Sequence, residues 1–219
     1  MVTTQPFFLK QTISLIKKYQ SASVLDIQTT MKINPVLASK TFEQFKNFSK
    51  KINNKPATHL YSGSVFTSLA ADTFNTQQLL FAQNNLLIIS GLYGLLRPLD
   101  TVSPYRLEIK FEYTFWKDII TNYLIQTDNI IIINLASKES TDVIDKKRLN
   151  KQIITIVFKE KKLDTFVIKA TYAKIARGLM ANYIIKHNIK KPEEIKKFNL
   201  ANYTFNKNLS DKNNFIFVR

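Results

Sequence analysis

The stretch IIIINLASKES, residues 130–140, decides the fold class that this sequence predicts. Its opening run of isoleucines is typical of a strand buried on both faces, and the run LLII at residues 86–89 has the same character. Helical patterns lie between these runs, at residues 76–83 and 115–126. Short apolar runs that alternate with helices predict a mixed α/β (α+β) fold, in which a central mixed sheet is flanked by helices.

The segments on either side extend this pattern. The first third is expected to be helical, because Asn34 and Pro35 are a typical N-cap and first residue of a helix. Downstream, the patterns predict a hairpin of residues 152–158 and 165–169, a long helix at 172–187, a short helix from Pro192, and pairing of residues 203–205 with 215–218. Since no linker or internal repeat interrupts the chain, residues 1–219 are expected to form a single domain.

The composition excludes several kinds of chemistry. The chain has 219 residues, 45% of them hydrophobic, and no cysteine, which excludes disulfides, thiol catalysis and cysteine-based metal centres. Only His59 and His187 could supply imidazole ligands, so neither a metal nor another cofactor is expected. No segment approaches the roughly 20 apolar residues of a membrane span, and the start MVTTQPFF lacks the pattern of a signal peptide. We therefore expect a cytoplasmic protein without a membrane partner.

The net charge of +16 indicates a polyanionic partner, because lysines that neutralise phosphates release condensed counterions. The basic excess lies at residues 1–60 and 138–197, on both sides of a nearly neutral centre. This distribution predicts a specific site within a general electrostatic collar. The alternative is a lysine-rich surface that serves solubility alone.

Rare residues are concentrated at residues 90–108, SGLYGLLRPLDTVSPYRLE, which hold two of the 4 glycines and two of the 6 prolines. A turn with Gly91 and Gly94 lets backbone approach a ligand closely, and the prolines favour an ordered, extended loop. Arg97 and Arg106 would be held on this loop to contact phosphate. Alternatively, they pair with Asp100 and Glu108 and only pin the loop.

Three apolar runs end in polar residues, and the motif HLYSGS at residues 59–64 is taken as the end of the third strand. If the three strands are parallel, their polar ends meet in one crevice at the carboxyl edge of the sheet. That crevice would be lined by Tyr61, Ser62, Gly91, Tyr93, Arg97, Asn134, Ser137 and Lys138, beside Gly94 and Arg106. The interpretation requires that none of the strands runs antiparallel to the others.

The predicted helix TYAKIARGLMANYIIKH places Lys174 and Arg177 on one face, three residues apart. Cations near a helix N-terminus oppose its dipole, so an anion or a partner is expected to compensate them. Gly178 in mid-helix indicates close approach of another backbone, through packing or through function.

Residue types that can act in catalysis are present, but they do not form a recognisable combination of nucleophile, base and acid. Carboxylates at Asp100, Glu108 and Asp118 and hydroxyls at Ser90, Ser137 and Tyr93 lie far in sequence from both histidines. An enzyme acting on a small phosphorylated or nucleotide substrate in the crevice therefore stays the alternative to a binding protein.

Four motifs in order, SGLYGLLRPLDTVSPYRLE, FWKDIITNYL, NLASKE and YAKIARGLM, closely resemble the YaaA family of bacterial peroxide-stress proteins. The resemblance implies a cytosolic single-domain α/β protein with a positively charged cleft and a helix-hairpin-helix element, for which the turn at Gly91 and Gly94 and the helix around Gly178 are candidates. It implies binding to duplex, bubble and junction DNA during peroxide stress, with no established catalysis. Family members begin with a strand ending in Ser-Pro-Ala-Lys, which the start MVTTQPFF lacks, so a shortened N-terminus is expected.

Overall fold

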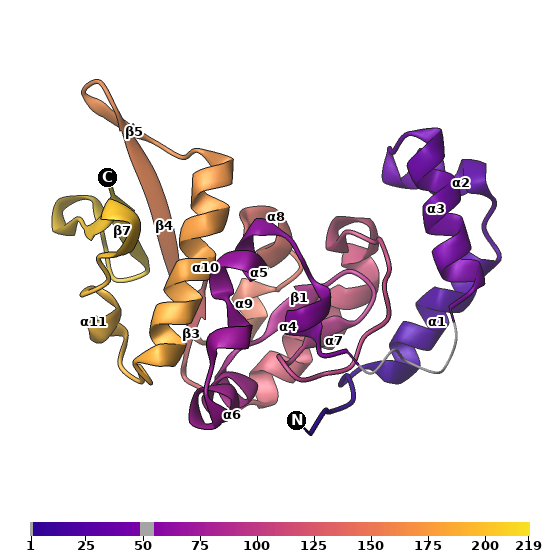
Figure 1. Ribbon diagram of the computed structural model, residues 1–219, viewed down its shortest axis with the longest axis horizontal. Helices are drawn as coiled ribbons and strands as arrows, with labels where there is room; N and C mark the ends of the chain where they lie inside the picture. The colour runs from indigo at the N-terminus through magenta and orange to yellow at the C-terminus, as the bar shows by residue number, and fades with distance from the viewer. Residues whose placement is uncertain (1, 49–54) are drawn as a thin grey trace. The chain divides into compact units, whose positions relative to one another are not determined.

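A computed structural model of the chain describes residues 2–48 and 55–219, which divide into two units (Figure 1). Unit 1 comprises Met1–Leu60, Asn85–Leu124 and Lys138–Leu149, and unit 2 comprises Tyr61–Asn84, Ile125–Ser137 and Asn150–Arg219. Each unit is therefore assembled from segments that are distant in sequence.

Unit 1 begins with the helices α1 (Leu9–Gln20), α2 (Val24–Met31) and α3 (Pro35–Lys46), as the helical pattern predicted. The predicted cap of α3 is confirmed, because Asn34 Oδ1 accepts a hydrogen bond of 2.9 Å from the Leu37 N–H. A capping box between Ser23 and Asp26 starts α2.

A buried carboxylate ties these helices to the next part of unit 1. The ring of Tyr19 stacks on Phe45 of α3, with 4.7 Å between ring centroids. Glu112, at the end of the 3-10 helix η2 (Ile109–Glu112), accepts hydrogen bonds of 2.6 Å from both the Tyr19 hydroxyl and Lys18 Nζ. Burial and the contact with Glu112 raise the pKa of Tyr19, so the hydroxyl remains a donor.

The rest of unit 1 is built of short elements around a buried tryptophan. They are α4 (Ala57–Leu60), β1 (Ile88–Ser90), β2 (Gly94–Leu96), α7 (Tyr113–Gln126), α8 (Lys138–Thr141) and α9 (Lys146–Leu149). Trp116 on α7 is fully buried, and its Nε1 donates a hydrogen bond of 2.8 Å to the Gly91 carbonyl. The indole therefore fixes the turn that joins β1 to β2.

Unit 2 contains a five-stranded mixed sheet with the order β3-β4-β7-β6, to which β5 adds through β4. Its strands are β3 (Ile131–Asn134), β4 (Gln152–Lys162), β5 (Thr165–Val167), β6 (Thr204–Phe205) and β7 (Asn214–Val218). β3 and β7 run parallel to β4, whereas β5 is antiparallel to β4 and β6 to β7. The predicted pairing of residues 203–205 with 215–218 is confirmed, and so is a hairpin between β4 and β5, but residues 165–167 pair with residues 160–162 and not with the predicted 152–158.

Helices and 3-10 turns complete unit 2. They are α5 (Ser64–Leu69), η1 (Ala71–Thr73), α6 (Thr76–Asn85), α10 (Ala170–Lys186), α11 (Pro192–Ile195), η3 (Leu200–Asn202) and η4 (Lys207–Leu209). The long helix and the short helix that begins at Pro192 are confirmed.

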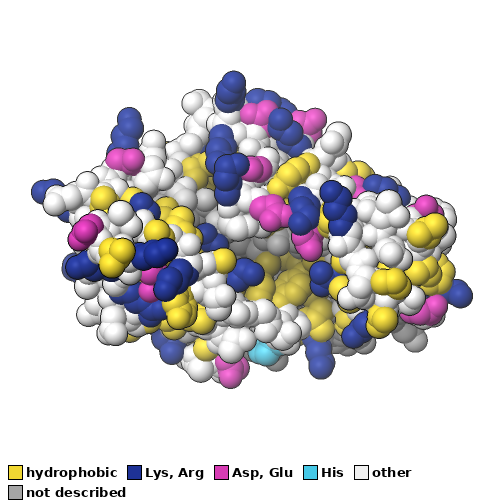
Figure 2. Space-filling model, turned by 90° about the horizontal axis from the view of Figure 1, so that it is seen from above, with side chains coloured by type: hydrophobic (Ala, Val, Ile, Leu, Met, Phe, Trp, Pro, Cys, Tyr) yellow, Lys and Arg dark blue, Asp and Glu magenta, His cyan; other side chains and the backbone are white. Residues whose placement is uncertain are grey.

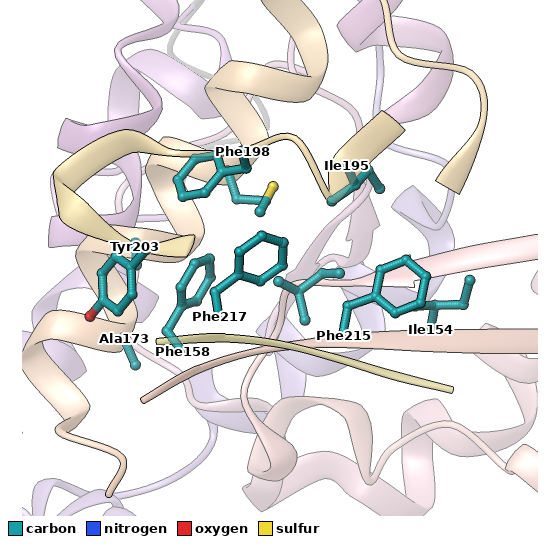
Figure 3. Packing of buried hydrophobic residues seen from close by; sticks show 11 residues of the cluster. Ile154, Phe158, Ala173, Ile195, Phe198, Tyr203, Phe215 and Phe217 are labelled. Atoms are coloured by element: carbon teal, nitrogen blue, oxygen red, sulfur yellow. The ribbon is translucent and has the colours of Figure 1, made fainter. Parts of the chain in front are cut away.

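The core of unit 2 lies between one face of the sheet and the helices beside it. Ile154, Ile156 and Phe158 are buried at alternate positions of β4, as the period of a strand requires. Figure 3 shows Phe158 and Phe217 of β7 pointing to the same side of the sheet, toward Phe198. Residues of α10 and α11 complete the same cluster, which contains Ala173, Ala176, Met180 and Ile195. Burying one such large side chain stabilises the fold by about 1.5–3 kcal/mol.

Small residues let α10 lie close to α5. A Cβ on Gly178 would lie 2.2 Å from the Val65 carbonyl oxygen and 2.7 Å from Ser68 Cβ, so the predicted close approach of another backbone is confirmed and is a packing contact. Asn182 Nδ2 donates a hydrogen bond of 2.7 Å to the Leu69 carbonyl at the end of α5. The two helices are therefore held together by close packing and by this hydrogen bond.

The mixed α/β class with a mixed sheet is thus confirmed, and the single-domain organisation stays a prediction. One expectation about the sheet was wrong. β3 is an end strand of the sheet, and Ile130 beside it is 79% exposed, so this run is not buried on both faces. A run of isoleucines reports β propensity, but its burial depends on which strands flank it.

Candidate nucleic-acid interface

The twelve predicted site residues are shared between the two units. Unit 1 holds Gly91, Tyr93, Gly94, Arg97, Arg106 and Lys138, and unit 2 holds Tyr61, Ser62, Asn134, Ser137, Lys174 and Arg177.

The glycine turn of residues 91–94 is packed by its own unit. A Cβ on Gly91 would lie 2.1 Å from the Leu107 carbonyl oxygen, and one on Gly94 would lie 2.6 Å from the Trp116 ring. Gly94 also has φ +71°, which permits the tight reversal from β1 into β2. Both glycines are accounted for by packing and by the turn.

Tyr93, within the turn, is buried and acts as a structural hydrogen-bonding group. Its hydroxyl accepts a hydrogen bond of 3.0 Å from the Ser103 N–H, and its own N–H donates one of 3.0 Å to Ser90 Oγ. Burial raises the pKa of Tyr93, although the hydrogen bond from Ser103 opposes this effect. The phenol is therefore protonated near neutral pH and is a poor nucleophile.

The predicted crevice at three parallel strand ends was wrong. β1 pairs antiparallel with β2 in a two-stranded sheet of its own, while β3 belongs to the five-stranded sheet. The motif HLYSGS ends the short helix α4 and is not the end of a strand. A short apolar run does not reveal its pairing partner, which is why the sequence suggested one sheet.

The contacts of Arg97 stabilise the fold of unit 1. Its Nη2 donates to Asp100 Oδ1 at 2.9 Å and to the Gln5 carbonyl at 3.1 Å, and its guanidinium lies 4.3 Å from the centroid of the Phe7 ring. Asp100 is fully buried and also accepts a hydrogen bond of 2.5 Å from Thr4 Oγ1. Of the two alternatives for Arg97, pinning of the loop is the one that these contacts support.

Arg106 has a weaker partner. Its Nη2 lies 3.7 Å from Glu108 Oε1, and Glu108 also binds Lys110 Nζ at 2.6 Å. Both members of the Arg106 pair are more than 40% exposed, so the attraction is screened by water. The guanidinium is available to exchange Glu108 for another anion.

The end of β3 is organised by local hydrogen bonds. Asn134 is buried, its Oδ1 accepts from the Ala136 N–H at 2.9 Å, and its Nδ2 lies 3.3 Å from Thr155 Oγ1 on β4. Ser137 is half-buried, and Lys138 is 88% exposed with Asp142 Oδ2 at 2.8 Å from its Nζ. Tyr61 packs on Phe66 with 4.9 Å between ring centroids, and Ser62 is exposed. None of these polar side chains is buried without a hydrogen-bond partner.

Arg177 on α10 is different from every other arginine of the chain. Its Nε is buried and has no hydrogen-bond partner, and its guanidinium forms no ion pair with any residue in the ranges 2–48 and 55–219. Desolvation lowers the pKa of Arg177, but the side chain stays charged at neutral pH. Lys174 lies one turn away on the same helix and is exposed. Arg177 as a whole is half-buried, and a guanidinium whose Nε is withdrawn from water without a partner is unfavourable on its own, so this pair is suited to an external anion.

Positive charge is spread over both units. Unit 1 carries 17 Lys and Arg against nine Asp and Glu, and unit 2 carries 15 against seven, so each has a net charge of +8. Figure 2 shows Lys and Arg side chains distributed over the visible face, interspersed with acidic ones. Charge of this kind supports general attraction of a polyanion but does not define a single contact patch.

Comparison with known proteins decides the family. The family model for "Peroxide stress protein YaaA" matches residues 1–209. The chain belongs to the YaaA family of peroxide stress proteins. It is 43% identical to a UPF0246 protein of Francisella philomiragia over 232 residues, which cover 99% of this chain and 91% of the relative. A UPF0246 protein of Francisella tularensis subsp. novicida is 41% identical over the same shares of both chains.

Within residues 2–48 and 55–219, no helix is long and apolar enough to cross a membrane. The same residues contain no group of three or more His, Asp or Glu side chains that could hold a metal ion.

Proposed function

We propose that this YaaA-family protein binds DNA in the cytoplasm during peroxide stress, both as intact duplex and as bubbles or junctions. The observation that carries the proposal is Arg177, whose buried Nε has no hydrogen-bond partner and whose guanidinium has no counter-ion within residues 2–48 and 55–219, since a phosphate would supply one. Lys174 would add a second, more hydrated contact to the same or the next phosphate. The proposed activity requires neither a metal nor another cofactor.

The charge of both units supports a large electrostatic contribution. Each unit carries +8, so either can approach the DNA backbone favourably, and lysines such as Lys146, Lys147 and Lys151 would contribute without base specificity. Affinity is then expected to fall steeply with salt, each phosphate contact adding about 0.9 to the slope of log affinity against log salt.

We propose that the helix-hairpin-helix element implied by the family corresponds to α2 and α3. Neither earlier candidate fits, because the turn at residues 91–94 joins two strands and Gly178 lies in mid-helix against α5. The connection between α2 and α3 is short, and Lys32 occupies the left-handed region with φ +51°. Exposed Lys32 and Lys40 lie at this connection and on α3, where they would contact phosphates.

An enzyme acting on a small phosphorylated substrate is not supported. That alternative depended on polar residues at three converging strand ends, and β1 lies in a different sheet from β3. The single buried phenol of the glycine turn, Tyr93, is protonated and hydrogen-bonded to Ser103, so it offers no reactive oxygen.

Fluorescence anisotropy with labelled duplex, bubble and junction DNA over a salt series tests the proposal. Arg177→Gln is expected to reduce affinity about fivefold or more and to lower the salt slope by about 0.9, as for the loss of one phosphate contact. Arg148→Gln is the matched control, because Arg148 is already paired with Asp118 and with Asn122 Oδ1 at 2.7 Å. Absence of salt-sensitive binding by the wild-type protein would refute DNA binding, and equal effects of the two variants would remove Arg177 from the interface.

A further inference from the structure

The hairpin of β4 and β5 ends in a two-residue turn that stands clear of its unit. Glu160, Lys161 and Lys162 pair with Val167, Phe166 and Thr165, so only Leu163 and Asp164 form the turn. In Figure 1 the tip of this hairpin extends well past the end of α10 and past β7. Every residue from 161 to 165 is exposed.

The residue at the tip is unusual for its position. Leu163 has φ +53°, a left-handed conformation that leucine rarely adopts and that glycine or asparagine occupies easily. Its side chain is 85% exposed, the second highest exposure among the large apolar residues after Val2. Neither the turn nor the packing of unit 2 gives a reason for an apolar side chain here, so its contact is expected to lie outside the chain.

The base of the hairpin is held rigidly. Arg219 Nε lies 2.9 and 3.1 Å from the two carboxylate oxygens of Glu160, and the Tyr203 hydroxyl donates to the same carboxylate. The Arg219 guanidinium also lies 4.7 Å from the centroids of both the Tyr172 and the Tyr203 rings. The tip is therefore presented in one orientation, and binding need not order a mobile loop.

Charge at the tip favours a polyanion. Lys161 and Lys162 are exposed and form no ion pair in the described part of the chain, and Asp164 is the one acid of the turn. The next acid along the strand, Glu160, is neutralised by Arg219. An apolar residue preceded by two exposed lysines, Lys161 and Lys162, matches the chemistry of DNA, in which phosphates line both sides of the stacked bases.

We propose that this hairpin enters a groove of DNA and that Leu163 inserts at a weakly stacked base step while Lys161 and Lys162 contact the flanking phosphates. This inference rests on the proposed DNA binding and adds a preference for distorted sites. Two-stranded ribbons are used in the major or the minor groove of DNA, and apolar wedges that enter a base step from the minor groove are a known way to recognise deformable DNA. A lipid surface is the less favoured partner, since one leucine beside the half-buried Phe166 buries little apolar area.

The test compares Leu163→Asn with Leu163→Met in the full chain. Asparagine suits the left-handed turn and removes the wedge, whereas methionine keeps an apolar side chain. Leu80→Asn is the matched control, because Leu80 is an exposed apolar residue of the same unit, on α6. Anisotropy is measured with intact duplex and with duplex carrying a single mismatch, and 2-aminopurine next to the mismatch reports unstacking.

Leu163→Asn is expected to weaken mismatch binding about tenfold and to abolish the 2-aminopurine signal, with less than about a twofold effect on intact duplex. Leu163→Met and Leu80→Asn are expected to behave like the wild type. If Leu163→Asn matches the wild type on both DNAs, the wedge is wrong while DNA binding stands. If the wild type binds no DNA at low salt, the proposed function fails and the wedge with it. If Leu163→Asn instead loses binding to phosphatidylserine vesicles and leaves DNA binding unchanged, the tip is a lipid contact and the proposal is overturned.

Discussion

Arg219 Nε lies within 3.1 Å of both carboxylate oxygens of Glu160, which joins the residue after β7 to the C-terminal end of β4. The pair is largely withdrawn from water, and the Arg219 side chain lies against the Tyr172 and Tyr203 rings. This contact connects β4, α10 and the C-terminal strand, and it holds the base of the β4–β5 hairpin.

Arg219→Ala is expected to lower the free energy of unfolding by about 2–3 kcal/mol, because it leaves the Glu160 carboxylate buried without its cation. Urea denaturation followed by circular dichroism measures the change. Arg148→Ala, which removes an exposed pair with Asp118, is the control and is expected to cost less than about 1 kcal/mol. Similar losses for the two variants would contradict a buried role for the Arg219 pair.

The same carboxylate predicts an acid-dependent loss of stability. Burial raises the pKa of Glu160, but hydrogen bonds from Tyr203 and Arg219 and the Arg219 charge outweigh it, so the pKa is lowered overall. Because the unfolded pKa is about 4.3, the stabilisation is complete above that pH and is lost as the pH falls through the lower folded value. Unfolding of Glu160→Gln, measured between pH 7 and pH 3, is expected to depend less on pH than that of the wild type. An unchanged pH profile would show that Glu160 does not carry this effect.

Gly178→Ala is expected to destabilise the protein by about 1–3 kcal/mol, although alanine is the better helix former. A Cβ at this position would lie 2.2 Å from the Val65 carbonyl oxygen, so α5 must move away from α10. Gly63→Ala is the control, since no atom lies within 4 Å of the Cβ that it adds. Thermal unfolding compares the two, and a stable Gly178→Ala variant would mean that the two helices separate at little cost.

Asp100→Ala is expected to cost about 3 kcal/mol, because it leaves the Arg97 guanidinium and Thr4 without their buried partner. Glu108→Ala is the matched control, since its pair with Arg106 is exposed and spans 3.7 Å. Urea midpoints measure both changes. Equal shifts would argue that Arg97 does not pin the loop, and its role in anion binding would then be open again.

Arg177→Met is expected to leave the melting temperature unchanged or to raise it by about 2–4 °C, because it removes a half-buried charge that has no counter-ion among the described residues. The affinity for DNA should fall in the same variant, which is the result expected if Arg177 binds a ligand and does not stabilise the fold. Differential scanning fluorimetry with and without duplex DNA measures both effects. A marked loss of stability without DNA would instead indicate a structural role for Arg177.

Much of the secondary structure follows from local signals. Asn34 and Pro35 start α3. The apolar stripe of residues 172–187 corresponds to α10. These features depend on neighbours in the chain, through capping hydrogen bonds and the helical period, so they could be predicted from sequence alone.

The candidate site was predicted only in part, because its residues depend on partners far along the chain. Arg97 and Arg177 carry the same guanidinium, yet Arg97 meets the buried Asp100 and Arg177 meets no counter-ion among the described residues. Leu163 was also not singled out, because its high exposure is a property of the folded chain that no local sequence pattern indicates.

The sequence by itself determined the longer helices α3 and α10, the net charge of +16 and the family motifs, because each of these resides in composition or in short stretches of chain. Only the tertiary structure decided that residues 86–89 join an antiparallel hairpin and that residues 130–133 join the parallel part of the sheet. It alone decided which cations are paired. Strand pairing and ion pairing are long-range contacts, and their energies depend on which segments the folded chain brings together.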